Sequence, residues 1–111
     1  MQKLAQFIKI LGDTSRLSII RAIGNKALSV TEIINDTGLS QTLVSFHLRN
    51  LREAGIVTSR REGPFIFYNL KDISLIDILD RLAIIANLKC DFFRSSPALL
   101  DDAKKISAQG R

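Results

Sequence analysis

The segment Ser40–Ala54 constrains the fold of this chain more than any other segment, because its sequence predicts a helix with a defined start and end. Ser40 is a favourable N-cap residue, since its hydroxyl can accept a hydrogen bond from a free amide of the first helical turn. Gly55 follows the last periodic residue, where a left-handed C-terminal cap is expected.

The predicted helix has two different sides when its residues are placed at about 100° intervals. One side is largely apolar and carries Leu43, Val44, His47, Leu48 and Leu51. The other side is a polar strip without an acidic residue, formed by Gln41, Thr42, Ser45, Arg49 and Arg52. These side-chain types contact base edges and phosphate oxygens in protein–DNA complexes. The segment is therefore interpreted as a DNA recognition helix.

Within this helix, different contacts are expected along the polar strip. We expect Gln41, Thr42 and Ser45 to lie nearest the bases. Arg49 and Arg52 are expected nearer the phosphates, and Ser40 is grouped with these five as a DNA contact.

Three shorter helices are predicted before the recognition helix. Residues 2–11 are amphipathic, residues 14–23 can be capped by Asp13, Thr14 or Ser15, and residues 30–37 follow a capping-box pattern that starts at Ser29. A tight turn at Gly38 joins the third and fourth helices. The region of about 29–54 is therefore a predicted helix-turn-helix.

A β-hairpin is predicted directly after the recognition helix. Residues 56–60 and 65–70 are rich in β-branched and aromatic side chains, and the turn Arg61-Glu62-Gly63-Pro64 separates them. A hairpin at about 56–70 after a helix-turn-helix is a wing. Arg60 and Arg61 are expected at its tip, in contact with the DNA backbone or minor groove.

The last long helix is predicted over about 72–88 and is apolar around most of its circumference. Such a helix must bury more than one face, and a second copy of the chain is the simplest partner for the additional face. The helices at about 2–11 and 72–88 are therefore predicted to form a homodimer interface, made by Leu4, Phe7, Ile8, Leu11, Leu75, Ile78, Leu79, Leu82 and Ile85. Residues 89–111 are interpreted as a C-terminal tail.

Length and charge agree with a DNA-binding domain. The 111 residues fit a single domain over 1–111, and the net charge of +5 favours polyanionic partners. Residues 1–70 hold nine Lys and Arg against five Asp and Glu, so the basic excess lies with the predicted helix-turn-helix. No signal peptide or membrane span is evident and Cys90 is the single cysteine, which together favour a cytoplasmic protein.

The order and spacing of these elements resemble the ArsR-type winged-helix repressors. The matching segments are Leu11–Leu17, which has Thr14 where Pro is common, Gly38–Leu48 and Leu51–Val57. The resemblance implies a mainly α fold with a small β-hairpin (α+β), in the order α-α-α-α-β-β-α. It also implies a homodimer that binds an imperfect palindrome in double-stranded DNA and is released by an effector.

The metal sites of this family do not carry over to the chain. The thiolate pair of the third helix falls at Ser29 and Thr31, which are poor ligands for zinc or arsenite. The acid and histidine positions of the last helix fall near Asp72, Ser74, Ile85 and Leu88, and Asp72 alone could serve. No metal or other cofactor is expected, which leaves a small-molecule or redox effector open.

Two further residues have both a chemical and a structural interpretation. His47 lies on the inward side of the recognition helix, which favours a packed, hydrogen-bonded role over metal binding or catalysis. Cys90 could be a redox sensor, but it lacks a resolving cysteine, which favours an inert thiol. Arg16 could equally form a structural ion pair or contact a phosphate.

The leading hypothesis is a homodimeric transcriptional repressor that binds a specific DNA sequence. The alternative is a winged helix that acts as a protein–protein interaction module without specific DNA binding. An enzyme is not expected, because the sequence contains no Gly-rich phosphate loop, no paired carboxylates and no nucleophile with an evident base.

Overall fold

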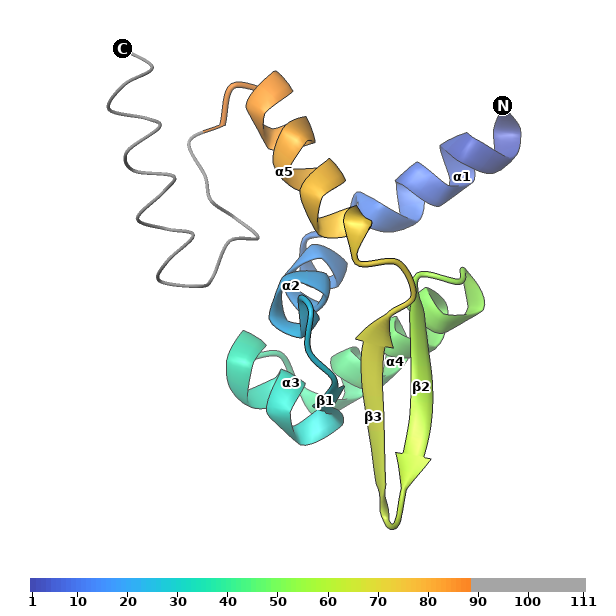
Figure 1. The fold of residues 1–111 in the computed structure, drawn as a ribbon, viewed down its shortest axis with the longest axis vertical. Coiled ribbons are helices and arrows are strands. Elements are labelled where there is room, and N and C mark those ends of the chain that lie inside the picture. The colour runs from blue at the N-terminus through green and yellow to red at the C-terminus, as the bar shows by residue number, and fades with distance from the viewer. Residues whose placement is uncertain (89–111) are drawn as a thin grey trace. The chain divides into compact units, whose positions relative to one another are not determined.

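The computed structural model describes residues 1–88 of the chain (Figure 1). The elements are α1 (Gln2–Leu11), α2 (Thr14–Ile23), β1 (Leu28–Ser29), α3 (Val30–Thr37), α4 (Gln41–Glu53), β2 (Val57–Glu62), β3 (Phe65–Leu70) and α5 (Ser74–Ile85). They fall into two units, of which the first ends at Ile73 and the second begins at Ser74 with α5. The predicted tail and Cys90 lie outside the described residues.

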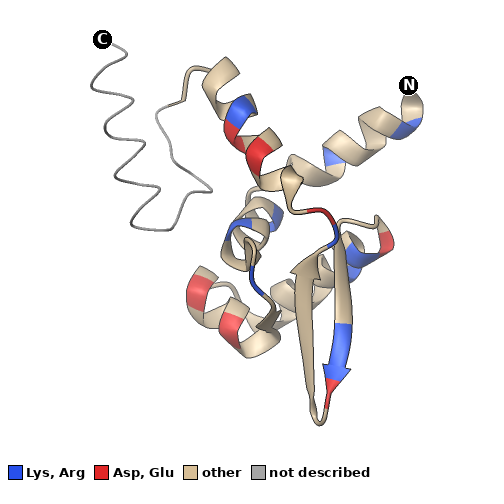
Figure 2. Cartoon of the chain, viewed as in Figure 1, with Lys and Arg blue, Asp and Glu red and all other residues tan. Residues whose placement is uncertain are grey.

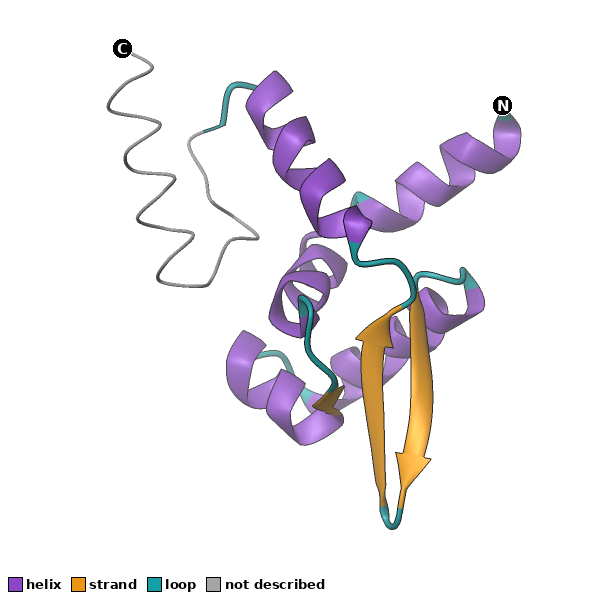
Figure 3. Ribbon diagram, viewed as in Figure 1, coloured by secondary structure: helices purple, strands orange, loops and turns teal. Residues whose placement is uncertain are grey.

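The predicted fold class is confirmed, since helices dominate and the strands form one small antiparallel sheet in the order β1-β3-β2 (Figure 3). The two-residue strand β1 was not predicted. It pairs with the middle of β3, where Leu28 lies opposite Tyr68. This short strand ties the segment before α3 to the wing.

The wing strand β2 is longer than predicted, so the prediction that Arg60 and Arg61 lie at the wing tip is wrong. Both arginines lie within β2, opposite Phe67 and Ile66 of β3. Pairing continues to Glu62, and the turn consists of Gly63 and Pro64 alone. The physical reason is that the chain reverses within two residues, with Gly63 at a φ of 61°.

The hydrophobic core of the first unit is formed by aliphatic side chains of α2, α3, α4 and the base of the wing. Its fully buried members are Ile19, Ile20, Ile23, Ile33, Val44, Leu48, Leu51 and Val57. Four of these side chains come from α2 or α3, which pack against α4. The core therefore fixes the orientation of α4 within the helix-turn-helix.

Local capping explains where the helices begin. Ser29 and Glu32 form the reciprocal capping box at the start of α3, with Ser29 N donating to Glu32 Oε1 over 2.9 Å. Ser40 caps α4 by accepting a hydrogen bond from Leu43 N over 3.2 Å. The sequence offered Asp13, Thr14 and Ser15 as possible caps of α2, and the structure shows that Asp13 is the N-cap. The predicted caps of α3 and α4 are confirmed.

The end of α4 is also as predicted. Gly55 has a φ of 77°, a left-handed conformation that strains any residue with a Cβ atom. Gly55 N donates to Arg52 O and Ile56 N donates to Leu51 O, which is the hydrogen-bond pattern of a Schellman motif. The recognition helix therefore ends at a defined point, and three residues separate it from β2.

The helix α5 is shorter than the predicted 72–88. It covers Ser74–Ile85 and ends in a left-handed turn at Asn87, whose φ is 61°. Asn tolerates this conformation, so it can serve as a C-terminal cap in place of glycine. Among residues 1–88, no helix has both the length and the apolar character that a membrane span requires.

Candidate DNA-binding surface

The polar strip predicted on α4 is exposed along its whole length. Its five members and the N-cap residue are all solvent-accessible, namely Ser40, Gln41, Thr42, Ser45, Arg49 and Arg52. Val44, His47, Leu48 and Leu51 on the opposite side are buried. One helix therefore presents side chains of the types that contact bases and phosphates on one face, while its other face anchors it in the core.

The strip is not free of acidic residues, contrary to the prediction. Glu53 follows it on the same side of α4, and Glu53 Oε2 lies 3.5 Å from Arg49 Nε. Both side chains are largely exposed, so this pair contributes little to stability. Its consequence is electrostatic, because it partly neutralises Arg49 in the absence of DNA.

Two exposed hydrophobic residues on α4 were missed or misplaced. Leu43 was predicted on the buried side but is 43% exposed, and Phe46, which received no role, is 55% exposed. At 100° per residue, Phe46 lies about 40° from Thr42, and this position is the sequence signal that could have identified it. An exposed phenylalanine beside polar residues of the types that contact bases can contact a thymine methyl group.

The wing carries a cluster of charged and aromatic side chains on its paired strands. Arg60 Nε lies 2.7 Å from Glu62 Oε2, and the Arg60 guanidinium lies 5.7 Å from the centre of the Phe67 ring. Arg61 is exposed. Figure 2 shows the basic residues on β2, followed by an acidic residue close to the turn. Arg60 is therefore held in place on the wing, at the cost of a neighbouring negative charge.

His47 has a structural role, as the sequence predicted. It is 7% exposed, and its Nδ1 accepts a hydrogen bond from Arg16 Nε over 3.2 Å. An Nδ1 that accepts is unprotonated, so a neutral ring carries its proton on Nε2. Nε2 lies 3.9 Å from Asp13 Oδ2, which is too long for a hydrogen bond.

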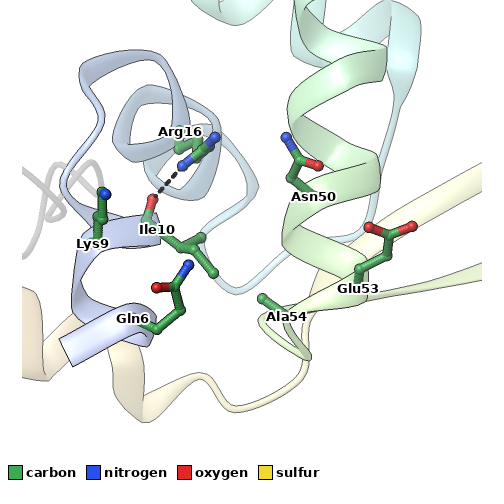
Figure 4. Close-up of a pocket in the computed structure, with 7 residues that line it drawn as sticks. All are labelled: Gln6, Lys9, Ile10, Arg16, Asn50, Glu53 and Ala54. Carbon is green, nitrogen blue, oxygen red and sulfur yellow. Dashed lines mark hydrogen bonds between the residues drawn. The ribbon is translucent and has the colours of Figure 1, made fainter. Parts of the chain in front are cut away.

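Arg16 links neighbouring helices through hydrogen bonds rather than through an ion pair. Its Nε reaches His47 on α4, and its Nη1 donates to the carbonyl oxygen of Ile10 on α1 over 3.2 Å (Figure 4). A single guanidinium thus joins three helices. This geometry favours the structural interpretation of Arg16 over a phosphate contact.

Ser29, one of the positions that the resemblance assigns to a metal ligand, has another role in this chain. The Ser29 hydroxyl accepts a hydrogen bond from Glu32 N over 3.2 Å in the α3 capping box. Across the described residues, no three His, Cys, Asp or Glu side chains come together as a possible metal site.

The residues predicted for the dimer interface leave apolar surface exposed on α1 and on α5. On α1, Leu4 and Ile8 are each 54% exposed, while Phe7 and Leu11 are half-buried. On α5, the most exposed members of the set are Ile78, Leu82 and Ile85, while Leu75 and Leu79 are half-buried. Exposed aliphatic surface of this kind is typical of an interaction site.

Comparison with known proteins places this arrangement among regulatory proteins. Residues 13–59 match the family model described as bacterial regulatory protein, arsR family. A helix-turn-helix transcriptional regulator of Methanocaldococcus jannaschii is 35% identical over 79 residues, which are 70% of this chain and 89% of that protein. The arsenical resistance operon repressor of Staphylococcus aureus is 32% identical over 91 residues, which are 80% of this chain and 88% of the repressor.

A solved structure agrees with these sequence relatives. The homodimeric winged helix-turn-helix DNA-binding domain of a possible ArsR-family transcriptional regulator from Mycobacterium bovis matches with a TM-score of 0.68 and 26% identity. The match covers 78% of this chain and 80% of that domain.

Proposed function

Since the chain belongs to the ArsR family of bacterial regulatory proteins and is a DNA-binding transcriptional regulator, we propose that its homodimer represses transcription by placing α4 in the major groove of an imperfect palindrome. The family is made of transcriptional regulators. The observation that carries the proposal is the polar strip, which is exposed on a helix whose opposite face is buried.

Different residues of α4 contact the DNA bases and the DNA backbone. Gln41, Thr42 and Ser45 lie in the first half of the helix, which enters the groove in helix-turn-helix complexes, and they contact base edges. Arg49 and Arg52 lie toward the other end and contact phosphates. Ser40 adds a hydroxyl at the helix N-terminus, where a phosphate oxygen is also favoured.

The wing supplies a second set of contacts. Arg60 and Arg61 on β2 bind the DNA backbone or enter the minor groove alongside the site that α4 occupies. Because α4 contacts β2, a helix in the major groove brings the wing to the adjacent part of the duplex. Phe46 adds an apolar contact to a thymine methyl group.

Two copies of the chain associate through apolar side chains of α1 and α5. The exposed aliphatic side chains on both helices support this role. Two copies related by a two-fold axis present two recognition helices, which matches a palindromic site. An effector other than a typical zinc or arsenite complex relieves repression, because Ser29 and Thr31 replace the usual thiolates.

The proposal is tested by measuring binding to the DNA upstream of the protein's own gene, against a shuffled fragment of equal length. We expect preference for the upstream fragment and an affinity that falls steeply with salt concentration. Equal affinity for both fragments would contradict sequence-specific binding and favour a protein-interaction module.

A matched pair of substitutions locates the contact surface. Arg49 and Arg81 each form an exposed i,i+4 pair with a carboxylate, on α4 and α5 respectively. Arg49→Gln should weaken DNA binding and reduce the slope of log affinity against log salt by about one. Arg81→Gln removes the same charge from a helix without a proposed DNA contact and should leave that slope unchanged.

A further inference from the structure

The tip of the wing is apolar, although the strand that leads to it is basic. This apolar tip consists of four exposed residues, namely Gly63, Pro64, Phe65 and Ile66. Phe65 is 59% exposed and Ile66 is 40% exposed. Figure 1 shows that the hairpin carries this turn beyond α3 and α4. The first unit therefore does not use the apolar tip for its own packing.

The side chains of the apolar tip cannot bind phosphate oxygens. Proline, phenylalanine and isoleucine side chains have no hydrogen-bond donor, and Pro64 also lacks a backbone N–H. The cationic side chains of the wing lie on β2, where Arg61 is directly opposite Ile66 and Arg60 is one residue farther from the turn. Backbone contacts by these two arginines therefore leave the exposed apolar groups in front of them without a role.

Phe65 shares one face of the hairpin with a second aromatic ring and an ion pair. The strand register places Phe65 opposite Glu62, and it places Phe67 opposite Arg60. The ring centres of Phe65 and Phe67 are 6.4 Å apart, so the exposed ring has an aromatic neighbour on the side away from the turn. Arg60 compensates the carboxylate of Glu62 over 2.7 Å. Phe65 is thus an apolar group with a cation close to it.

This combination of residues matches the chemistry of minor-groove insertion. Proteins that bind the minor groove place Phe, Ile or Pro side chains between neighbouring base pairs, where they partly unstack the bases and kink the duplex. Arginines beside the inserted group are attracted by the phosphates on both sides of the groove. A surface for a protein partner would not need cations next to its apolar groups.

We propose that the ring of Phe65 enters the minor groove next to the site of α4 and inserts between two base pairs, with Arg60 and Arg61 on the flanking phosphates. This inference rests on the proposed function, because it requires α4 in the adjacent major groove. The inserted ring kinks the duplex once in each half of the palindrome.

Insertion of Phe65 gives the wing a sequence preference of its own. Pyrimidine–purine steps, which are TA and CA/TG, are unstacked more easily than A-tract steps. Because β2 contacts α4, the unstacked step lies at a constant distance from the bases that α4 contacts. The operator therefore carries a TA or CA/TG step at this distance, although no side chain of the apolar tip can form a hydrogen bond to its bases.

Insertion is tested with the full-length protein and the upstream fragment, in which one adenine at a time is replaced by 2-aminopurine. The fluorescence of this base is quenched by stacking and rises when the base is unstacked. Every TA and CA/TG step contains an adenine, so the series covers all candidate steps. With saturating protein, we expect a rise at one step on each side of the site.

Two variants assign the unstacking to its side chain. Phe65→Ala should bind the upstream fragment in preference to the shuffled fragment but should abolish the rise. Ile73→Ala removes a side chain that is 62% exposed from a residue outside the wing, and should keep the rise. A rise that persists in Phe65→Ala, or that is lost equally in both variants, would overturn the role of Phe65.

The sequence preference has its own measurement. Replacement of the unstacked step by AA should lower the affinity of the natural protein about tenfold, the effect of one unfavourable position in a site. Phe65→Ala should bind both fragments with equal affinity. An equal loss in both proteins would overturn the preference and leave the apolar tip as a surface for another partner.

The possible failures are distinguishable. Preference for the upstream fragment without a fluorescence rise at any adenine would overturn insertion and leave the proposed function. Equal affinity for the upstream and shuffled fragments would overturn both.

Discussion

Arg16 on α2 donates a hydrogen bond from Nε to Nδ1 of His47 on α4, over 3.2 Å. The single histidine of the chain is thus the acceptor that holds a connecting arginine in place. This pair fixes α4 to the N-terminal helices at a point opposite the polar strip.

Replacement of His47 should destabilise the fold. His47→Leu removes the acceptor of Arg16 Nε in a partly buried site, and the loss should be about 1–3 kcal/mol in the free energy of unfolding. Urea denaturation at a fixed protein concentration measures it. Phe46→Leu, the neighbouring exposed position, should change stability by less than about 0.5 kcal/mol. Equal effects would contradict the role of the hydrogen bond.

The turn between α3 and α4 depends on a left-handed residue. Gly38 has a φ of 75°, and an added Cβ would meet no atom within 4 Å, so Gly38→Ala tests the backbone conformation alone. We expect a loss of about 1–2 kcal/mol in the free energy of unfolding. Gly12 has a φ of −80° at the end of α1, where Gly12→Ala should be neutral or slightly stabilising.

Phe46 should contribute to sequence specificity. If its ring contacts a thymine methyl group, replacing that thymine by uracil should cost about 0.8 kcal/mol, or roughly fourfold in affinity. Phe46→Ala should bind the thymine and uracil sites equally well. Competition binding with operators substituted one thymine at a time gives the answer, and an unchanged thymine preference in Phe46→Ala would exclude this contact.

Because Arg60 and Glu62 form an ion pair on the wing, we expect substitutions of these two residues to have opposite effects on DNA affinity. Glu62 lies 2.7 Å from Arg60, so Glu62→Gln should free the guanidinium and raise DNA affinity two- to fivefold, or about 0.5–1 kcal/mol. Arg60→Gln should lower the affinity. Fluorescence anisotropy at one salt concentration compares them, and an unchanged affinity in both variants would show that the wing does not contact DNA.

Charge placed on the exposed side of α1 should separate the two copies. Ile8→Glu introduces a carboxylate into the proposed interface, where burial without a partner is costly, and should raise the dimer dissociation constant on the order of a hundredfold. Gln2→Glu places the same charge at an exposed residue outside the predicted set. Sedimentation equilibrium distinguishes the two, and a stable Ile8→Glu dimer would exclude α1 from the interface.

Features encoded by neighbouring residues were predictable from the sequence. The capping box at Ser29, the N-cap at Ser40 and the left-handed Gly55 depend on residues within one helical turn, and the boundaries of α1 and α3 follow from such signals. The longer wing strand and the two-residue β1 depend on pairing with β3, which no local pattern encodes.

The same distinction applies to the candidate site. Helical periodicity gives the angle of each side chain around α4, but it does not give the arc that the rest of the fold covers. The part of the α4 circumference that the fold buries does not include Leu43. The exposed part extends to Phe46 and Glu53. The polar strip was therefore found from the sequence, while its apolar and acidic neighbours required the structure.

The short connection after α4 fixes the position of the wing relative to the recognition helix. Ile56 N donates to Leu51 O within the helix terminus, and Ile56 O accepts from Lys71 N just beyond the end of β3. One buried residue thus ties the end of the recognition helix to the base of the wing. The recognition helix and the base of the wing are therefore fixed relative to one another, so the DNA contacts proposed for them require one particular groove spacing. A duplex with the correct bases but a different groove width satisfies one of the two contacts and loses the other.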